Sequence, residues 1–357
     1  MHNRYVVIMA GGRGERFWPQ SRAKTPKHIL PIVGSKSMLS QTLDRLAGFL
    51  PTSNIWVLTN QEQRNAVQEC CSLLPPENVI GEPHGRDTAA AIGLSLILLQ
   101  QRDPEATFAV LPADHYVQDQ QNFQKVLETS FQIAESQKSL VTIGIEPNYP
   151  ATGYGYIEKG EVILGKNCYS VKRFVEKPTI ETAEVYLKSG NYFWNAGMFI
   201  WKVSVLEDCF KRFIPTLYQT LQKIRTALLQ GQPLDILLER EYPKLEKISI
   251  DYALMEKAEN VVCLPATFDW DDVGEWLSIA RHFPQDTQNN TVNGEMVSTD
   301  AHHNIVVNQK GHLTAMIGVQ DLIVVQTEDA TLICSKDRAQ EIKNTVKKIT
   351  SKYPHLI

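Results

Sequence analysis

The sequence has no hydrophobic run long enough to cross a membrane. Its longest nearly apolar stretch, residues 89–99, is far shorter than the roughly 20 residues that a transmembrane helix needs. Residues 1–12 also lack the layout of a secretory signal peptide, because their short apolar run leads directly into a glycine-rich loop. We therefore predict a cytoplasmic protein with no membrane partner.

An excess of one charge is missing as well. The chain carries 36 Lys and Arg against 40 Asp and Glu, a net charge of −4, and so lacks the basic character typical of nucleic-acid-binding proteins. Its six cysteines are scattered and include no C-x-x-C pair, which argues against a zinc site and a disulfide framework. We predict reduced, mostly buried thiols and no nucleic-acid partner.

Two familiar nucleotide-binding loops are also absent, although a glycine-rich segment is present. Residues 10–19 read AGGRGERFWP and follow RYVVIM, which is typical of a buried strand. A dinucleotide fingerprint requires a third glycine where Phe17 stands. A P-loop requires Lys-Ser or Lys-Thr where Glu15 and Arg16 stand. Both interpretations therefore fail on residue type.

The residues that the loop does contain still favour an anion. Gly11, Gly12 and Gly14 let the backbone turn so that its N–H groups converge on a phosphate. Arg16 can add a planar, forked donor, and Lys27 can add a compact point charge. The alternative is a glycine-rich turn with solvated basic residues. The preceding strand and the following Lys27 lead us to favour a phosphate site.

The pattern along the chain predicts an α/β fold with two domains. Strand-like runs alternate with helical patterns through the first half of the 357 residues, which favours βαβ units and a Rossmann-like, mostly parallel mixed sheet. A polar stretch at 283–295 marks a boundary. We predict one domain over 1–284. Residues 285–357 then form a small β domain, or a short β-solenoid, that ends in a helix.

Three polar segments each follow a predicted strand of the first domain. They are the glycine loop, GEPHGRDT (81–88) and LPADH (111–115). Ligands bind at the carboxyl ends of parallel strands, so we expect all three along one rim. Asp87 or Thr88 can cap the apolar helix that follows. A carboxylate such as Glu82 can accept hydrogen bonds from the N1 and N2 hydrogens of guanine.

Acidic residues in two distant segments are candidates for a metal site. Asp114 follows a strand, and the segment FDWDDVGEW (268–276) contains Asp269, Asp271 and Asp272. Mg²⁺ commonly takes one or two carboxylates together with substrate phosphates. The alternative is that Asp114 forms a turn or a helix cap and that the later acids form a solvated turn around core tryptophans.

Three further segments offer groups that suit a sugar phosphate. TGYGYI contains Gly153 and Gly155, which can permit close approach of a ligand or simply form a turn. FVEKP contains Glu176 and Lys177. The carboxylate of Glu176 suits sugar hydroxyls, and the ammonium of Lys177 suits a phosphate. In YFWNAGMFIW, an amide in an apolar stretch needs a partner, from a ligand or from the backbone; the residues are Asn195 and Gly197.

Taken in order, these segments resemble the sugar-1-phosphate nucleotidylyltransferases over residues 7 to about 276. GRDTAAA, WNAGMF and DWDDVGEW resemble the mannose-1-phosphate guanylyltransferase branch. The resemblance implies transfer of GMP from GTP to mannose 1-phosphate, which yields GDP-mannose and pyrophosphate with Mg²⁺ as cofactor. Alternatives are a different nucleotide and sugar-phosphate pair, or a catalytically silent subunit that binds a nucleotide sugar.

The resemblance also implies roles for individual residues. Arg16 and Lys27 would be catalytic, and the GTP phosphates would lie against Ala10, Gly11, Gly12, Arg13 and Gly14. The guanine and ribose would be surrounded by Glu82, Gly85, Arg86 and Thr88. The mannose would contact Gly153, Glu176, Asn195 and Gly197, with Lys177 on its phosphate, and Mg²⁺ would be held by Asp114 and Asp272.

Two features depart from common family forms. Asp87 stands where many members carry Asn, so we expect its carboxylate to point to the helix as a cap and away from the phosphates. The chain also ends at Ile357, without room for the phosphomannose isomerase domain of some longer relatives. We expect the C-terminal segment to serve packing or self-association and to help build a homodimer.

Overall fold

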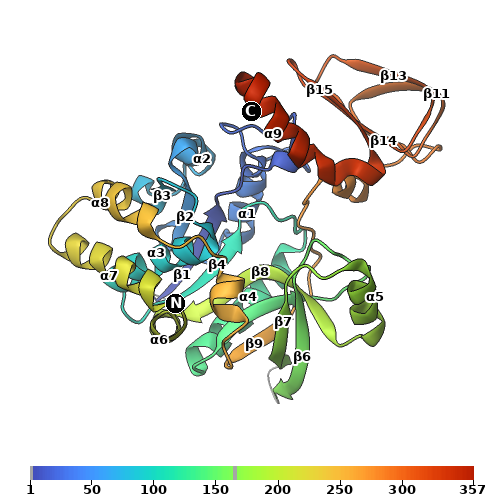
Figure 1. Cartoon of the computed structure of the whole chain (residues 1–357). Helices are drawn as coiled ribbons and strands as arrows, with labels where there is room; N and C mark the ends of the chain where they lie inside the picture. Colours follow the sequence, from blue (N-terminus) through green and yellow to red (C-terminus); the bar gives the residue numbers. More distant parts are fainter. Residues whose placement is uncertain (1–2, 164–166) are drawn as a thin grey trace.

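The computed structural model describes residues 3–163 and 167–357, which form a large α/β domain and a smaller β domain (Figure 1). The large domain contains a nine-stranded sheet with the order β3-β2-β1-β4-β8-β5-β9-β7-β6. Its strands are β1 (Arg4–Ala10), β2 (Ile55–Asn60), β3 (Val79–Glu82), β4 (Thr107–Pro112), β5 (Leu140–Ile145), β6 (Tyr156–Ile163), β7 (Cys168–Val175), β8 (Tyr192–Lys202) and β9 (Val261–Pro265).

The direction of the strands confirms the predicted mostly parallel mixed sheet. β1 pairs in parallel with both β2 and β4, and β2 pairs in parallel with β3. β8 lies antiparallel between β4 and β5, and β7 lies antiparallel to β6 and β9. Among the described strands of this sheet, only β7 and β8 oppose the others. The carboxyl ends of β1, β3 and β4 therefore lie on one edge.

Both faces of the sheet are covered by helices because the central strands are apolar on both sides. Tyr5 and Val7 of β1 pack with one helical layer, and Val6 and Ile8 pack with the other. The first layer consists of α3 (Asp87–Arg102), α6 (Val203–Phe213), α7 (Pro215–Leu229) and α8 (Leu234–Glu241). The second consists of α1 (Met38–Leu46), α2 (Arg64–Cys70), α4 (Gln120–Ser136) and α5 (Ile180–Ser189).

The C-terminal β domain has the predicted β-helix-like character. β10 (Thr291–Asn293), β12 (Ile305–Val307) and β14 (Leu322–Gln326) pair in parallel, and β15 (Thr331–Ser335) joins β14 antiparallel. β11 (Glu295–His302) and β13 (Leu313–Gln320) form a second parallel pair. α9 (Ile342–Lys352) then returns toward the N-terminal loop (Figure 1). The domain boundary at 284/285 stays a prediction.

The two domains share one apolar core. Phe17 and Trp18 of the glycine-rich segment are buried with Trp276, Ile323 and Val346. The Phe17 and Trp276 rings lie 4.9 Å apart, and the Trp276 indole N–H donates to the Trp18 carbonyl at 3.1 Å. The β domain is therefore packed directly against the candidate phosphate loop.

The structure bears on the predictions about membrane-spanning segments, the cysteines and the terminal helix. No described helix combines the length and apolar character that crossing a bilayer requires. All six cysteines lie in the described part of the chain, none forms a disulfide, and four of them are buried. The predicted terminal helix is present as α9, and residues 336–341 before it form a 3₁₀ turn of the kind common at helix ends.

Candidate active site

A cavity of about 450 Å³ lies at the carboxyl edge of β1 and β4. It brings together the glycine loop, Lys27, Asp114 and Asp272. Its lining residues are Arg13, Gly14, Glu15, Arg16, Phe17, Lys27, Asp114, His115, Asp272, Gly274 and Lys343. The cavity thus brings the predicted metal-binding residues together with part of the predicted phosphate-binding set, from segments far apart in the sequence. Ala10, Gly11 and Gly12 are not among its lining residues.

Lys27 occupies the centre of this arrangement. It begins the short 3₁₀ turn Lys27–Ile29 and is only 5% exposed. Its Nζ donates to Asp114 Oδ2 at 2.9 Å and to the Asp272 carbonyl at 2.7 Å. Gly14 makes this approach possible, because a Cβ there would lie 2.6 Å from the Lys27 Cβ and Gly14 adopts a φ of +64°. The loop and the lysine are therefore fixed against each other.

The charges beside Lys27 are set by their neighbours. Desolvation is the largest single influence on the Asp114 carboxyl and raises its pKa. The charge and hydrogen bond of Lys27, together with His115 and His28, more than offset it and bring the pKa down to about 2. Burial lowers the pKa of His115 to about 4, so its imidazole is neutral at pH 7. The Trp270 indole N–H donates to His115 Nδ1 at 3.1 Å, which places the imidazole proton on Nε2.

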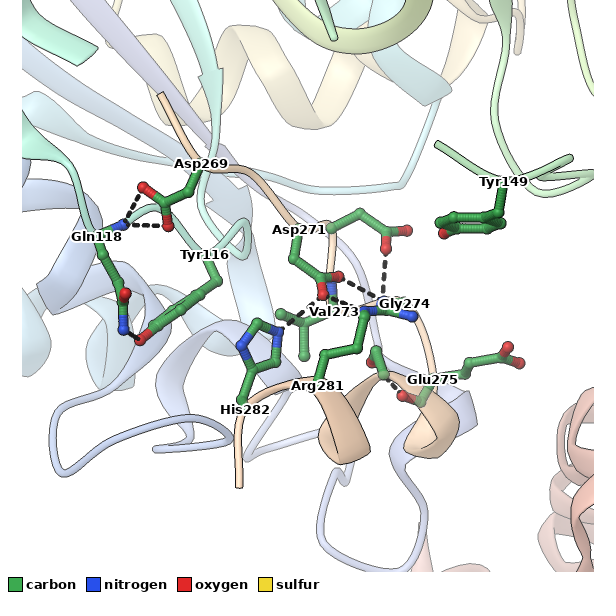
Figure 2. Close-up of polar contacts among 12 residues, drawn as sticks. Tyr116, Gln118, Tyr149, Asp269, Asp271, Val273, Gly274, Glu275, Arg281 and His282 are labelled. Carbon is green, nitrogen blue, oxygen red and sulfur yellow. Dashed lines mark hydrogen bonds and ion pairs between the residues drawn. The ribbon is translucent and has the colours of Figure 1, made fainter. Parts of the chain in front are cut away.

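The three aspartates between residues 268 and 276 have different surroundings (Figure 2). Asp269 accepts the backbone N–H of Gln118 at 2.9 Å (Figure 2). It also accepts the backbone N–H of Asp119 at 2.8 Å. Asp271 forms an ion pair with Arg281 at 2.6 Å and also contacts His282. Both carboxylates are therefore engaged by other groups of the protein. Asp272 is the member of the group that lines the cavity.

Asp272 and Asp114 have the chemistry of a magnesium site. Asp272 Oδ1 accepts the Tyr154 hydroxyl at 2.7 Å and the Gly274 N–H at 3.1 Å, which orients its carboxylate. No group of three or more His, Cys, Asp or Glu within 3–163 and 167–357 has a metal-binding arrangement. Two carboxylates in a cavity that also holds cationic side chains fit a hard cation that completes its shell with substrate oxygens and water.

The candidate base-binding residues lie at the end of β3 and contact the segment after α8. Glu82 is buried and accepts the Tyr242 hydroxyl. Burial raises the pKa of Glu82 to about 7, against the opposing effect of that hydrogen bond. Arg86 donates to the Pro243 carbonyl. The contact of Tyr242 with Glu82 was not predicted, because no local sequence pattern links the two residues.

The expected capping of α3 is wrong in detail. Asp87 is the first residue of the helix, Arg86 occupies the N-cap position, and the N-cap makes no side-chain hydrogen bond. Asp87 instead has a φ of 66°, a conformation that Asp and Asn tolerate better than most residues, and its carboxylate accepts the Thr88 N–H at 2.8 Å. Thr88 Oγ1 accepts the Ile250 N–H at 2.8 Å. Asp87 still turns toward the helix, but from inside it.

The candidate sugar-binding residues form a second polar cluster. Glu176 pairs with Lys177 at 2.8 Å, and a Cβ at Gly155 would lie 2.5 Å from Glu176 Oε2, so a larger residue there would displace the Glu176 carboxylate. Asn195 Nδ2 donates to Asp251 Oδ1 at 2.8 Å, and Asn195 Oδ1 accepts the Gly197 N–H at 3.1 Å. No Cβ contact would arise at Gly153, which faces open space.

Asp251 is the member of this cluster that sequence reasoning missed. Burial, and then the nearby Glu176 carboxylate, raise the pKa of Asp251 to about 6. It begins a single π-helical turn, Asp251–Met255, and its local sequence contains only one acid among apolar residues. That pattern is typical of an ordinary surface acid, so only the contact with Asn195 identifies it.

Comparison with known proteins identifies the families that the two parts of the chain match. Residues 5–289 match the nucleotidyl transferase family, and residues 294–349 match the mannose-phosphate isomerase/GMP-like β-helix domain. An Escherichia coli K12 protein described as mannose-1-phosphate guanylyltransferase is 36% identical, covering 98% of this chain and 74% of its own length. The xanthan biosynthesis protein XanB of Xanthomonas campestris is 37% identical over 97% of this chain and 73% of its own.

Solved structures show the same fold. A Thermus thermophilus protein described as mannose-1-phosphate geranyltransferase has a TM-score of 0.87 and 36% identity, covering 97% of this chain and 99% of its own. A Helicobacter pylori protein described as mannose-6-phosphate isomerase has a TM-score of 0.61 at 24% identity, covering 75% and 99%. The second likeness shows the fold alone.

Nucleotidyltransferases of this family act on a nucleoside triphosphate and a sugar 1-phosphate, and they generally use a divalent metal ion. The family match covers most of the chain, and the relatives extend over both domains. The chain is therefore a sugar-1-phosphate nucleotidyltransferase and belongs to the mannose-1-phosphate guanylyltransferase branch of the nucleotidyl transferase family.

Proposed function

We propose that this protein transfers GMP from GTP to α-D-mannose 1-phosphate and releases pyrophosphate. The observation that carries the proposal is the cavity in which cationic side chains of the glycine loop, Lys27 and two carboxylates meet. A site that must bring two polyanions together needs this mixture of cations and metal-binding oxygens. The names of the relatives support the choice of guanine and mannose.

The reaction is a direct displacement at phosphorus. A phosphate oxygen of mannose 1-phosphate forms a bond to the α-phosphorus of GTP in line with the bond to the β-phosphate oxygen, which breaks and releases pyrophosphate. The nucleophile is already an anion at neutral pH, so the reaction needs no general base. Catalysis therefore rests on positioning and charge.

In the proposed complex, the glycine loop and the metal site both contact the phosphates. In this proposal, backbone groups of Ala10, Gly11 and Gly12 contact the GTP phosphates. Arg13 and Arg16 of the cavity add charge, and Lys27 binds the α-phosphate and the leaving group. A magnesium ion held by Asp114 and Asp272 would supply positive charge that draws the phosphates together. Lys27 is already oriented by Asp114, so little rearrangement is needed when the phosphates bind.

The two polar clusters provide selectivity. Glu82, with Gly85, Arg86 and Thr88 around it, accepts from the N1 and N2 hydrogens of guanine, which adenine does not offer in that arrangement. Glu176, Asn195 and the glycines at 153 and 197 face the mannose, with Lys177 on its phosphate. A site that is built to accept hydrogen bonds from its substrate strongly rejects an analogue without those donors, because a buried acceptor is then left unpaired.

The proposal is tested by pyrophosphate release from purified protein. GTP, ATP, UTP and dTTP are each combined with Mg²⁺ and either mannose 1-phosphate or glucose 1-phosphate. Fast release only with GTP and mannose 1-phosphate is expected. Fast release with another pair would overturn our assignment of the base and sugar clusters, and no release from folded protein that still binds GTP would favour a silent subunit.

The pH dependence of guanine binding follows from Glu82. Only its ionised form accepts both guanine hydrogens, and its pKa is raised to about 7. The KM for GDP-mannose, measured in the pyrophosphorolysis direction, should therefore rise about tenfold from pH 8 to pH 6 as Glu82 takes up a proton. GDP-mannose is used because its diphosphate does not titrate in this range. Glu82→Gln should have a raised KM that no longer varies over these two pH units; a KM for wild type that is flat with pH would contradict the role of Glu82.

We also propose a homodimer that uses the outer face of the β11–β13 sheet. Leu313 and Ile317 of β13 and Val297 of β11 are 57%, 75% and 60% exposed, and the strands pair so that they share one surface. A second copy of the chain would bury this apolar surface. Light scattering should give twice the chain mass for wild type and for Leu73→Asp, an exposed site just after α2 in the large domain, but a monomer for Ile317→Asp. A monomeric wild type would contradict the proposal.

A further inference from the structure

The C-terminal β domain places one basic side chain in the cavity of the catalytic domain. Lys343 of α9 lines the cavity of about 450 Å³ together with Arg16, Lys27, Asp114 and Asp272. α9 contacts the 3₁₀ turn Glu15–Phe17, which carries Arg16 (Figure 1). A residue near the end of the chain is thus a neighbour of the phosphate loop near its beginning.

The position of α9 is held from two sides of the cavity. Ile342 and Val346, which flank Lys343 on the helix, are buried in the core that contains Phe17 and Trp18. Gln340, in the 3₁₀ turn just before α9, donates to the carboxylate of Glu275, close to Asp272 and Gly274. Lys343 therefore lies on a helix whose position is fixed. Only its flexible side chain has to move for the ammonium to contact a ligand.

The ammonium of Lys343 is available for a ligand. Within 3–163 and 167–357, Lys343 forms no side-chain hydrogen bond or ion pair, whereas Lys27 in the same cavity is bound to Asp114. An ammonium carries three donors and no acceptor, so an anion is its natural partner. The residues that face base and sugar, Glu82 and Glu176, do not line this cavity.

We propose that Lys343 binds the β- and γ-phosphates of the nucleoside triphosphate and the pyrophosphate that leaves. The inference rests on the proposed function, and it assigns the β domain a direct part in the active site of its own chain in addition to packing or self-association. The assignment to the outer phosphates follows from geometry, because α9 lies on the side of Arg16 and Glu275 and away from the base and sugar clusters.

The test compares Lys343→Ala with Lys347→Ala, which removes an exposed lysine one turn along the same helix and outside the cavity. In the reverse reaction, Lys343→Ala should raise the KM for pyrophosphate about tenfold, the effect of losing one charge-assisted hydrogen bond, and leave the KM for GDP-mannose unchanged. Lys343→Arg should recover part of the loss. Lys347→Ala should match wild type in both constants.

Two results would overturn the inference. One is a KM for pyrophosphate in Lys343→Ala equal to that of wild type. The other is an equal rise in the KM for pyrophosphate and GDP-mannose, which would indicate displacement of α9 and not loss of a phosphate contact. If wild type turns over no nucleotide sugar, the proposed function fails; calorimetric binding of magnesium pyrophosphate to wild type and Lys343→Ala then decides the inference separately, with equal affinities overturning it.

Discussion

Replacement of Lys27 by methionine is expected to lower turnover by about 10²–10³-fold, the loss found when one preorganised donor is removed from an active site. The Lys27 ammonium is held between Asp114 Oδ2 and the Asp272 carbonyl, at the junction of the candidate metal ligands and the glycine loop. Methionine keeps an unbranched stem at a position that is only 5% exposed but supplies no charge. The α-phosphate and leaving group would then lose their buried cation.

The measurement is kcat for pyrophosphate release at saturating GTP and mannose 1-phosphate. Lys24→Met is the matched control, because Lys24 is exposed, lies three residues earlier and lines a different cavity. Circular dichroism checks that Lys27→Met folds, since Asp114 loses its ion-pair partner but is 38% exposed and can be hydrated. A variant that folds and keeps wild-type turnover would refute the catalytic role of Lys27.

Much of the catalytic domain follows from local patterns in the sequence. The alternation of strand-like and helical segments predicted the parallel strands β1 to β4, and their order along the chain placed three loops on one edge. The antiparallel entry of β8 between β4 and β5 was not predicted. Its apolar run fits either direction, because a strand buried on both faces carries no pattern that depends on direction.

The site was predictable only as far as its residues belong to recognisable segments. Asp251, Tyr242 and Lys343 approach it from elements with ordinary composition, so only long-range packing shows where they lie. The choice among Asp269, Asp271 and Asp272 likewise depends on geometry. Asp269 accepts backbone N–H groups and Asp271 pairs with Arg281. The spacing of the acids in the sequence does not show these contacts.

Replacement of Asp272 by asparagine is expected to lower kcat by about 10²-fold or more and to raise the Mg²⁺ concentration needed for half-maximal rate. A bound metal ion stabilises developing charge by several kcal/mol, and loss of a carboxylate ligand weakens the binding of that ion. Asparagine keeps an Oδ1 that can accept from the Tyr154 hydroxyl and the Gly274 N–H. Lys27 uses the backbone carbonyl of Asp272, so its contact survives. The substitution therefore removes a negative charge and little else.

Asp269→Asn separates the metal role from a structural one. Asp269 is exposed and binds two backbone N–H groups outside the cavity, so its replacement should lower the free energy of unfolding by about 1 kcal/mol and leave the Mg²⁺ dependence unchanged. Titration of Mg²⁺ in the pyrophosphate assay, beside thermal unfolding, distinguishes the two variants. If Asp272→Asn shows only the stability loss and an unaltered Mg²⁺ requirement, Asp272 is not a metal ligand, and the paired-carboxylate site must be rejected.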